Sequence, residues 1–141
     1  MTVSSAVRRC PVSRTAASAL ARQVLRAERV GDAVLSVTFV GRRRIRTLSR
    51  RYLRRDHETD VIAFALSGAP GVVVGDVYVA PDVAAVAARR YGVPVREEVR
   101  RLVVHGVLHV LGYEHPDGTS RTRSPMWALQ ERLLRRTRGR P

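Results

Sequence analysis

The sequence predicts an α+β fold, in which one small sheet of about four strands is packed with about five helices. Short segments with apolar residues at every second position indicate the strands, and longer segments with apolar residues three or four apart indicate the helices. The two kinds of segment mix without strict alternation. The length of 141 residues suits one domain. We expect this domain to span 1–141, with fraying allowed at 1–10 and 137–141.

The first half of the chain should begin with an edge strand and continue with a helix rich in helix-forming residues. The first 27 residues contain no acid, a composition that also resembles a transit peptide, but the helix formers of 16–30 favour the folded alternative. A strand with clean alternation and a basic helix follow. The elements are expected at 2–7 (strand), 11–29 (helix), 33–40 (strand) and Arg42–Leu53 (helix).

The second half should supply the remaining strands and helices. Val61–Leu66 is apolar on both faces, which predicts a central strand. The strand at 72–80 contains Gly75 and Asp76, which should interrupt it. Helices are expected at Pro81–Tyr91, 94–112 and 124–136. The helix at 94–112 is apolar on all sides from Leu102 onward apart from two histidines, so it should cross the core.

The charge of the chain predicts a polyanionic partner. The formal net charge is +14, and all 26 basic residues are arginines. A genomic preference for arginine codons would explain the missing lysine but not the excess of base over acid. Arginine pairs with phosphate in bidentate fashion and stacks on bases, which suits nucleic acid. Cys10 is the single cysteine and fits a reducing compartment. No apolar run has the length of a membrane span.

Residues 105–115, HGVLHVLGYEH, predict a metal site. His105 and His109 lie four apart on a helix and so share one face. Gly112 can end the helix in the left-handed conformation, after which the chain can return His115 as a third ligand. Three imidazoles without a thiolate are typical of a catalytic zinc with one position open to water. The alternative is ordinary core histidines, although burying them unpaired would cost free energy.

The residue after the first histidine argues against peptide hydrolysis. Metallopeptidases of the HExxH type use that glutamate as the general base, and here the position is Gly106. Glu114 stands beside the third histidine as a weak candidate for the base, and a role in orienting an imidazole is an equal alternative.

Several other charged residues have simpler explanations. Asp76 should be a strand-end carboxylate bonded to backbone amides, and Asp60 should fix a turn. His57 should be exposed to solvent. The arginine run of 42–55 could be a solvated helix face, but without nearby acids to balance it we favour a track for RNA phosphates that leads toward the zinc.

Three blocks in the chain resemble the YbeY family of bacterial endoribonucleases, the ribosomal RNA maturation factors. The histidine block resembles the family pattern HGxLHLxGYDH, TDVIAF at 59–64 resembles TDVLSF, and GDV at 75–77 resembles GDI. The resemblance implies a mixed sheet, and zinc held at the end of a buried helix by His105, His109 and His115. It also implies cleavage of single-stranded RNA, trimming of small-subunit ribosomal RNA and ribosome quality control in the cytoplasm.

The chain departs from the family pattern at two positions. Many relatives carry an arginine, assigned a part in activity, directly after the tyrosine that precedes the TDV block. Here Leu53 follows Tyr52, and Arg54 and Arg55 come next as weak catalytic candidates. The other departure is Glu114, which replaces an aspartate and lengthens the carboxylate arm by one methylene.

We therefore expect a zinc-dependent endoribonuclease specific for single-stranded RNA, with ribosomal RNA and the small ribosomal subunit as partners. Neither DNA nor a membrane is an expected partner. Two alternatives remain open: a metallopeptidase with a metzincin-like histidine frame, and a non-catalytic ribosome assembly factor with structural zinc. The sequence leaves the cleavage site, the nucleophile and the oligomeric state undecided.

Overall fold

The computed structural model describes residues 1–53, 59–115 and 122–137. Within these residues the chain forms one four-stranded sheet and five helices, which confirms the α+β class. The elements are β1 (Thr2–Ser5), α1 (Arg14–Ala27), β2 (Asp32–Phe39), α2 (Arg42–Leu53), β3 (Val61–Leu66), β4 (Val72–Val79), α3 (Pro81–Tyr91), α4 (Val95–Val110) and α5 (Pro125–Thr137).

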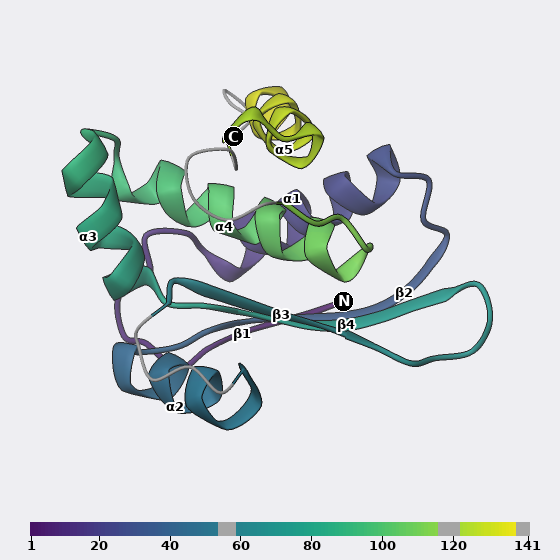
Figure 1. Ribbon diagram of the computed structural model, residues 1–141, viewed down its shortest axis with the longest axis horizontal. Coiled ribbons are helices and arrows are strands. Elements are labelled where there is room, and N and C mark those ends of the chain that lie inside the picture. Colours follow the sequence, from purple (N-terminus) through teal and green to yellow (C-terminus); the bar gives the residue numbers. More distant parts are fainter. Residues whose placement is uncertain (54–58, 116–121, 138–141) are drawn as a thin grey trace.

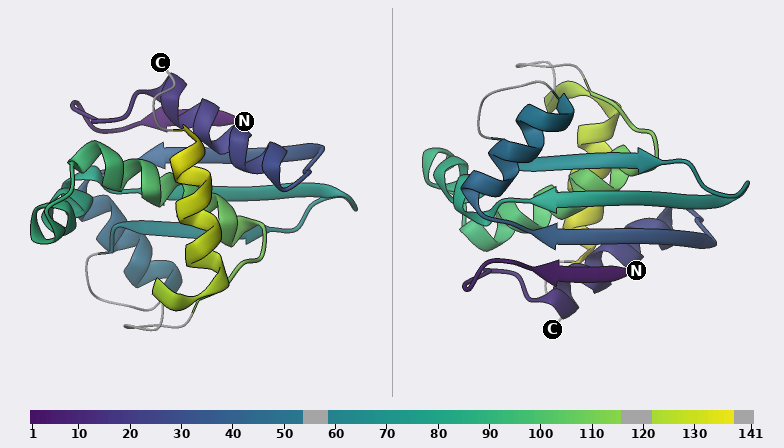
Figure 2. Two further views of the ribbon diagram at one scale, coloured as in Figure 1. Left: turned by 90° about the horizontal axis from the view of Figure 1, so that it is seen from above. Right: turned by 90° about the horizontal axis from the view of Figure 1, so that it is seen from below.

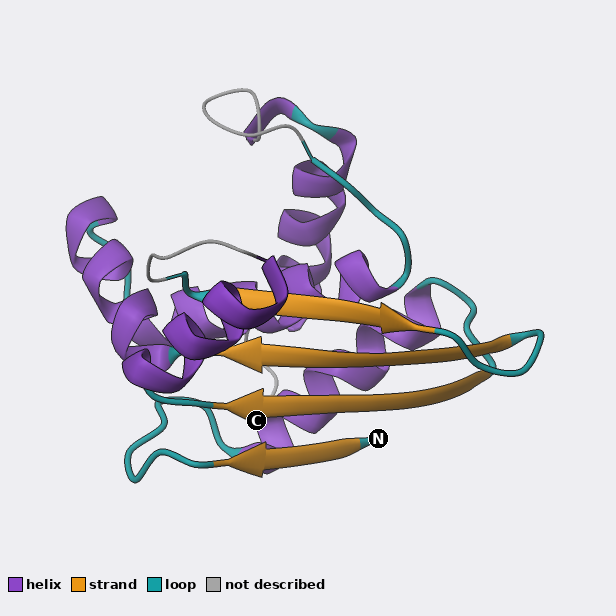
Figure 3. Cartoon of the chain, turned by 60° about the horizontal axis from the view of Figure 1, so that its bottom comes forward, coloured by secondary structure: helices purple, strands orange, loops and turns teal. Residues whose placement is uncertain are grey.

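The sheet is mixed, with the strand order β1-β2-β4-β3. β1 pairs in parallel with β2, and β2 in parallel with β4, whereas β3 is antiparallel to β4 (Figure 3). Residues 2–5, where we allowed fraying, are paired in register with 36–39.

Helices cover both faces of this sheet. α1 and α4 pack on one face, and α5 packs on α4 (Figure 1). α2 lies on the opposite face, and the views from above and below show the same separation (Figure 2). The larger core lies between the sheet and α1, α4 and α5, while a smaller core around Ile45, Leu48 and Ile62 lies under α2.

The expectation that Val61–Leu66 would be central is wrong, because β3 is an edge strand. Its apolar character has a different cause. Val61 lies near Gly106 of α4, while Ile62 belongs to the small core beneath α2. Helices therefore cover both faces of this edge strand, and an apolar sequence is required even without a second neighbouring strand.

β4 runs without a break through Gly75 and Asp76, contrary to the expected interruption. A Cβ on Gly75 would lie 2.4 Å from Cγ1 of Val110 on α4. A Cβ on Gly106 would lie equally close, 2.4 Å, to Cγ1 of Val77. At each glycine, a valine side chain of the other element fills the space that a Cβ would occupy. α4 therefore lies unusually close to β4.

α4 is the central helix of the fold, as its apolar sequence predicts. Residues 102–108 and Val110 are all buried, and Leu108 has no exposed surface. Removing a side chain such as Leu108 would cost about 2–5 kcal/mol of stability. None of the described helices combines the length and the apolar character needed to span a membrane.

Candidate metal centre

Three histidines converge at the carboxyl end of α4. His105 and His109 lie on consecutive turns of the helix, and His115 follows the helix after a short turn. Their ring centroids are 4.5 Å (His105–His109), 4.9 Å (His105–His115) and 5.0 Å (His109–His115) apart. One nitrogen from each ring lies within 4.8 Å of the others, so the group could hold one metal ion.

The turn after α4 brings the third ring back to the helix. Gly112 has φ +99°, a left-handed value that glycine adopts without strain. The N–H of Gly112 donates to the carbonyl of His109, and the N–H of Tyr113 donates to the carbonyl of Leu108, both at 3.0 Å. These two bonds are the Schellman motif, which ends the helix and satisfies its last carbonyls.

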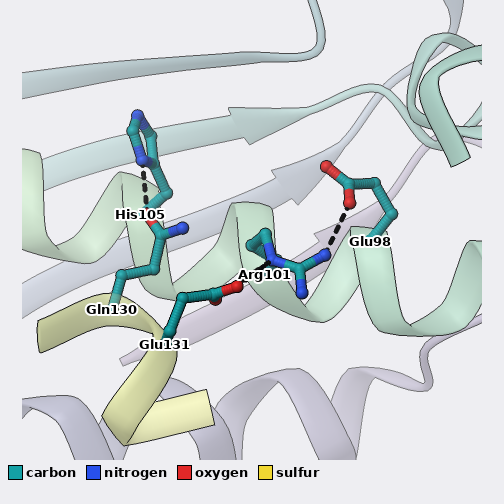
Figure 4. A network of polar contacts seen from close by, with 5 residues as sticks. All are labelled: Glu98, Arg101, His105, Gln130 and Glu131. Carbon is teal, nitrogen blue, oxygen red and sulfur yellow. Dashed lines mark hydrogen bonds and ion pairs between the residues drawn. The ribbon is translucent and has the colours of Figure 1, made fainter. Parts of the chain in front are cut away.

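Hydrogen bonds on the outer nitrogens orient two of the rings. Nδ1 of His105 donates to Oε1 of Gln130 at 2.6 Å (Figure 4). Nδ1 of His109 donates to the carbonyl of Tyr113 at 2.9 Å. Both acceptors are oxygens, so in the neutral rings the proton lies on Nδ1 and the lone pair lies on Nε2.

The two Nε2 atoms are 3.0 Å apart. With both protons on Nδ1, neither Nε2 can donate to the other, and two lone pairs at this distance repel. A cation between them removes the repulsion. Burial and, after it, electrostatic repulsion from the ring of His115 lower the pKa of His109, which favours the neutral ring with its lone pair available. The donor set therefore fits a metal that prefers nitrogen ligands.

Tyr113 connects this turn to the first helix. Its hydroxyl donates to Oε1 of Glu28, the residue that caps the carboxyl end of α1. This hydrogen bond and, to a lesser extent, burial raise the pKa of Tyr113. The residue whose carbonyl orients His109 is thus anchored at its side chain as well.

The position after His105 is closed to any side chain. A Cβ on Gly106 would lie 2.4 Å from Val77, and even its next contacts, at 3.3 and 3.4 Å, are tight. A glutamate at this position would collide with the side chain of Val77 on β4. The general base of the HExxH enzymes is therefore excluded by packing as well as by sequence.

Of the other candidate positions, the structure describes Glu114 and Leu53. Glu114 is exposed beside His115. Arg54, Arg55 and His57 lie outside the described residues. Leu53, which occupies the position of the family arginine, ends α2 and is 42% exposed.

Asp76 does not face the metal helix. Gly75 and Val77 point toward α4, so the alternation of a strand places Asp76 on the opposite face of the sheet. Its carboxylate accepts a hydrogen bond from the hydroxyl of Ser36 at 2.5 Å, not from the backbone amides that we expected. Asp60 instead lines a cavity beside His105.

The exposed arginines of α2 lie on the sheet face opposite to α4 (Figure 1). They are Arg42, Arg43, Arg44, Arg46, Arg50 and Arg51. The arginines for which we expected a phosphate track thus lie on an exposed basic helix, but the sheet separates this helix from the three histidines. An RNA that contacts both would have to pass around the sheet.

Gln130 is the site residue that the sequence did not reveal. It is 1% exposed, on a face of α5 otherwise formed by Met126, Leu133 and Leu134. A buried polar residue in an apolar stripe needs a hydrogen-bond partner. That rule marks Gln130 as unusual, but only the three-dimensional packing of α5 on α4 identifies His105 as the partner.

Comparisons with known proteins agree with the geometry. The sequence profile of the family described as endoribonuclease YbeY matches residues 3–138. A relative from Syntrophotalea carbinolica named endoribonuclease YbeY is 37% identical over 124 residues, which cover 84% of this chain and 83% of that protein. A relative of the same name from Anaeromyxobacter dehalogenans is 46% identical over 86 residues, which cover 60% of this chain but only 45% of that protein.

A solved structure shares the fold. The solution structure of a Thermotoga maritima protein superimposes with a TM-score of 0.64 and covers 95% of this chain and 87% of that one. The sequence identity is 24%, so this similarity supports the architecture alone.

Proposed function

Since this chain belongs to the endoribonuclease YbeY family, we propose that it is a zinc-dependent hydrolase that cleaves single-stranded RNA. The proposed ligands of the zinc are His105, His109 and His115. The observation that carries the proposal is the pair of Nε2 atoms 3.0 Å apart, each with its Nδ1 bonded to an oxygen. Three nitrogen ligands are typical of a catalytic zinc, because they leave one position for water or substrate.

The surface of the chain supports RNA as the substrate. The net charge of +14 attracts a phosphate backbone at low salt. The exposed arginines of α2 supply guanidinium groups that bind phosphates without reading the sequence. Neutral and basic peptides gain no comparable attraction from such a surface.

The packing around Gly106 weighs against a metallopeptidase. Peptide hydrolysis in the HExxH enzymes needs a carboxylate at this position, and here the contact with Val77 leaves no space for a side chain. Glu114 is the nearest acid in the sequence and would be the candidate base, but it is exposed.

Several residues of the chain would have distinct roles in the proposed RNA cleavage. When bound, zinc supplies a Lewis acid and lowers the pKa of its water. Gln130 and the carbonyl of Tyr113 hold the two helix imidazoles in the tautomer that directs Nε2 toward the ion. Arginines position the flanking phosphates, and Arg54 and Arg55 are the proposed source of a guanidinium close to the reaction.

The biological role that we propose is maturation of small-subunit ribosomal RNA and ribosome quality control in the cytoplasm. The family membership supports this role, and the basic surface suits an RNA-rich partner. The ribosomal substrate that we propose is a single-stranded segment.

Metal analysis combined with an RNA cleavage assay tests the proposal. The purified protein should contain about one zinc per chain and cut a labelled single-stranded RNA, and the His109→Ala variant should do neither. That variant should still melt cooperatively and bind RNA, whereas a structural zinc would leave it unfolded. A 2′,3′-cyclic phosphate on the products would identify the RNA's own 2′-hydroxyl as the nucleophile.

A control with casein distinguishes the proposed RNA cleavage from the metallopeptidase alternative. Chelator-sensitive digestion of casein without RNA cleavage would overturn the proposal in favour of a metallopeptidase. Because contaminating ribonucleases can imitate weak activity, the wild type and the His109→Ala variant should be purified in parallel.

A further inference from the structure

A cavity of about 280 Å³ opens beside His105, one of the three histidines. Asp60 and Val61 at the start of β3 contribute to its lining, together with residues of α4, of α5 and of the end of α3. His105 belongs to this lining, so a group that occupies the cavity lies next to one of the proposed metal ligands. The volume is below the roughly 300–1,000 Å³ of sites for drug-sized molecules, which suits a single ring system.

The cavity is acidic although the protein is strongly basic. Among the described residues that line it, Asp60, Glu98 and Glu131 bring carboxylates, and Arg101 brings the one guanidinium. Arg101 is already engaged: it donates to Glu98 at 2.7 Å and to the two oxygens of Glu131 at 2.9 and 3.1 Å (Figure 4). A phosphate would be repelled from these walls, whereas a neutral group with N–H donors would be attracted.

An aromatic side chain lines the same cavity. Trp127 of α5 is the only tryptophan of the chain and is partly buried there. Tyr91, which is 70% exposed, also contributes to the lining. Proteins recognise single-stranded RNA mainly by stacking unpaired bases on aromatic side chains and by bonding their polar edges.

We propose that this cavity binds one nucleobase of the RNA, from a nucleotide next to the scissile phosphate, an inference that rests on the proposed RNA cleavage. The base stacks on Trp127 and directs its N–H groups toward the carboxylates. Because carboxylates accept from exocyclic amines such as that of cytosine, cytosine binds more tightly than uracil, which lacks an amine. The phosphate of the same nucleotide stays outside, where the histidines lie.

The lone tryptophan reports directly on binding to the metal-loaded protein. Cytidine 5′-monophosphate should quench the fluorescence of Trp127, uridine 5′-monophosphate should do so more weakly, and ribose 5-phosphate, which lacks a base, should not. Equal quenching by ribose 5-phosphate, or none by either nucleotide, would overturn the proposal.

Cleavage of RNA with one abasic position gives a second measurement. In the wild type, removing the base that enters the cavity should lower kcat/KM by about 5- to 150-fold, the range that one stacked base contributes. The Trp127→Ala variant should lose a similar factor on intact RNA and lose little more on the abasic RNA. Trp127→Phe keeps an aromatic ring and should retain most of the discrimination, which separates stacking from a role in folding.

The outcomes distinguish this inference from the proposed function. If the wild type cuts intact and abasic RNA equally at every position tested, the base site is refuted and RNA cleavage stands. If the wild type cuts neither RNA but cytidine 5′-monophosphate still quenches Trp127, the base site stands and the cleavage proposal falls.

Discussion

The side chain of Gln130 fixes the ring of His105 through one short hydrogen bond. Gln130 is almost fully buried, so the bond is shielded from bulk solvent. The bond determines which nitrogen of His105 carries the proton, and therefore which nitrogen can face a cation. A neutral amide at this position orients the ring without adding charge to the site.

Replacing Gln130 tests its role as a positioning residue. Gln130→Leu has a similar volume but leaves the Nδ1–H of His105 without its acceptor, so zinc affinity should fall by about 10- to 100-fold. Gln130→Glu restores an acceptor and should bind zinc at least as tightly as the wild type. Competition with a chromogenic chelator measures both affinities. Wild-type affinity in the folded Gln130→Leu variant would show that the bond does not support the metal.

At the level of single residues, the sequence predicted the three histidines but not the residues that contact them. His105, His109 and His115 form a spacing that can be read without coordinates. Gln130 lies 25 residues from its partner, and no local pattern joins them. The orientation of Asp76 was missed because β4 continues through Gly75, which fixes the face to which each following residue points.

α4 and the turn after it form the element that determines the site. One backbone reversal at Gly112 ends the helix, places the carbonyl of Tyr113 against His109 and returns the chain toward His115. Any change in this reversal should therefore affect the metal as well as the helix.

Two glycines with positive φ provide a matched test of this coupling. Gly112→Ala and Gly92→Ala each place a Cβ in the left-handed region, at φ +99° and +68°, at the ends of α4 and α3. Each should cost about 1–2 kcal/mol of stability, measured by urea unfolding of the metal-free protein. Gly112→Ala alone should also weaken zinc binding, because Gly92 ends a different helix. Equal zinc affinities in the two variants would contradict the coupling.

Most element boundaries were predictable, because strand and helix periods differ clearly in this chain. Arg42–Leu53, Val61–Leu66 and Pro81–Tyr91 are found as expected. α1 begins at Arg14 because the hydroxyl of Ser13 caps it by accepting from the N–H of Ala16, and the expectation placed this start three residues too early. The order of the strands was not predictable, since a strand covered on both faces has the same sequence pattern at the edge and at the centre.

The whole molecule keeps its basic helix and its histidine cluster on opposite sides of the sheet (Figure 2). The formal charge predicts attraction to RNA but says nothing about where the charge lies. Only the topology shows that the arginines of α2 flank β3 from one side and α4 flanks it from the other. The acidic cavity beside His105 was equally invisible, because β3, α4 and α5 assemble it from distant segments.

The salt dependence of RNA binding tests whether α2 contacts phosphates. For single-stranded nucleic acid, each phosphate contact adds about 0.7 to the slope of log affinity against log salt concentration. The double variant Arg43→Gln/Arg44→Gln should therefore lower this slope by about 1.4. Arg89→Gln/Arg90→Gln removes the same charge from the exposed end of α3 and should leave the slope nearly unchanged. The same loss in both variants would mean that only net charge matters.

The paired contacts of Gly75 with Val110 and of Gly106 with Val77 have a mechanical consequence. Each valine fills the space beside a glycine that has no side chain. A shift of α4 along β4 would therefore bring both valines into steric conflict with neighbouring side chains. The helix and the strand therefore move as one rigid body. Any motion that changes access to the histidines must therefore come from elements other than α4 and β4, since the floor of the site is locked in place.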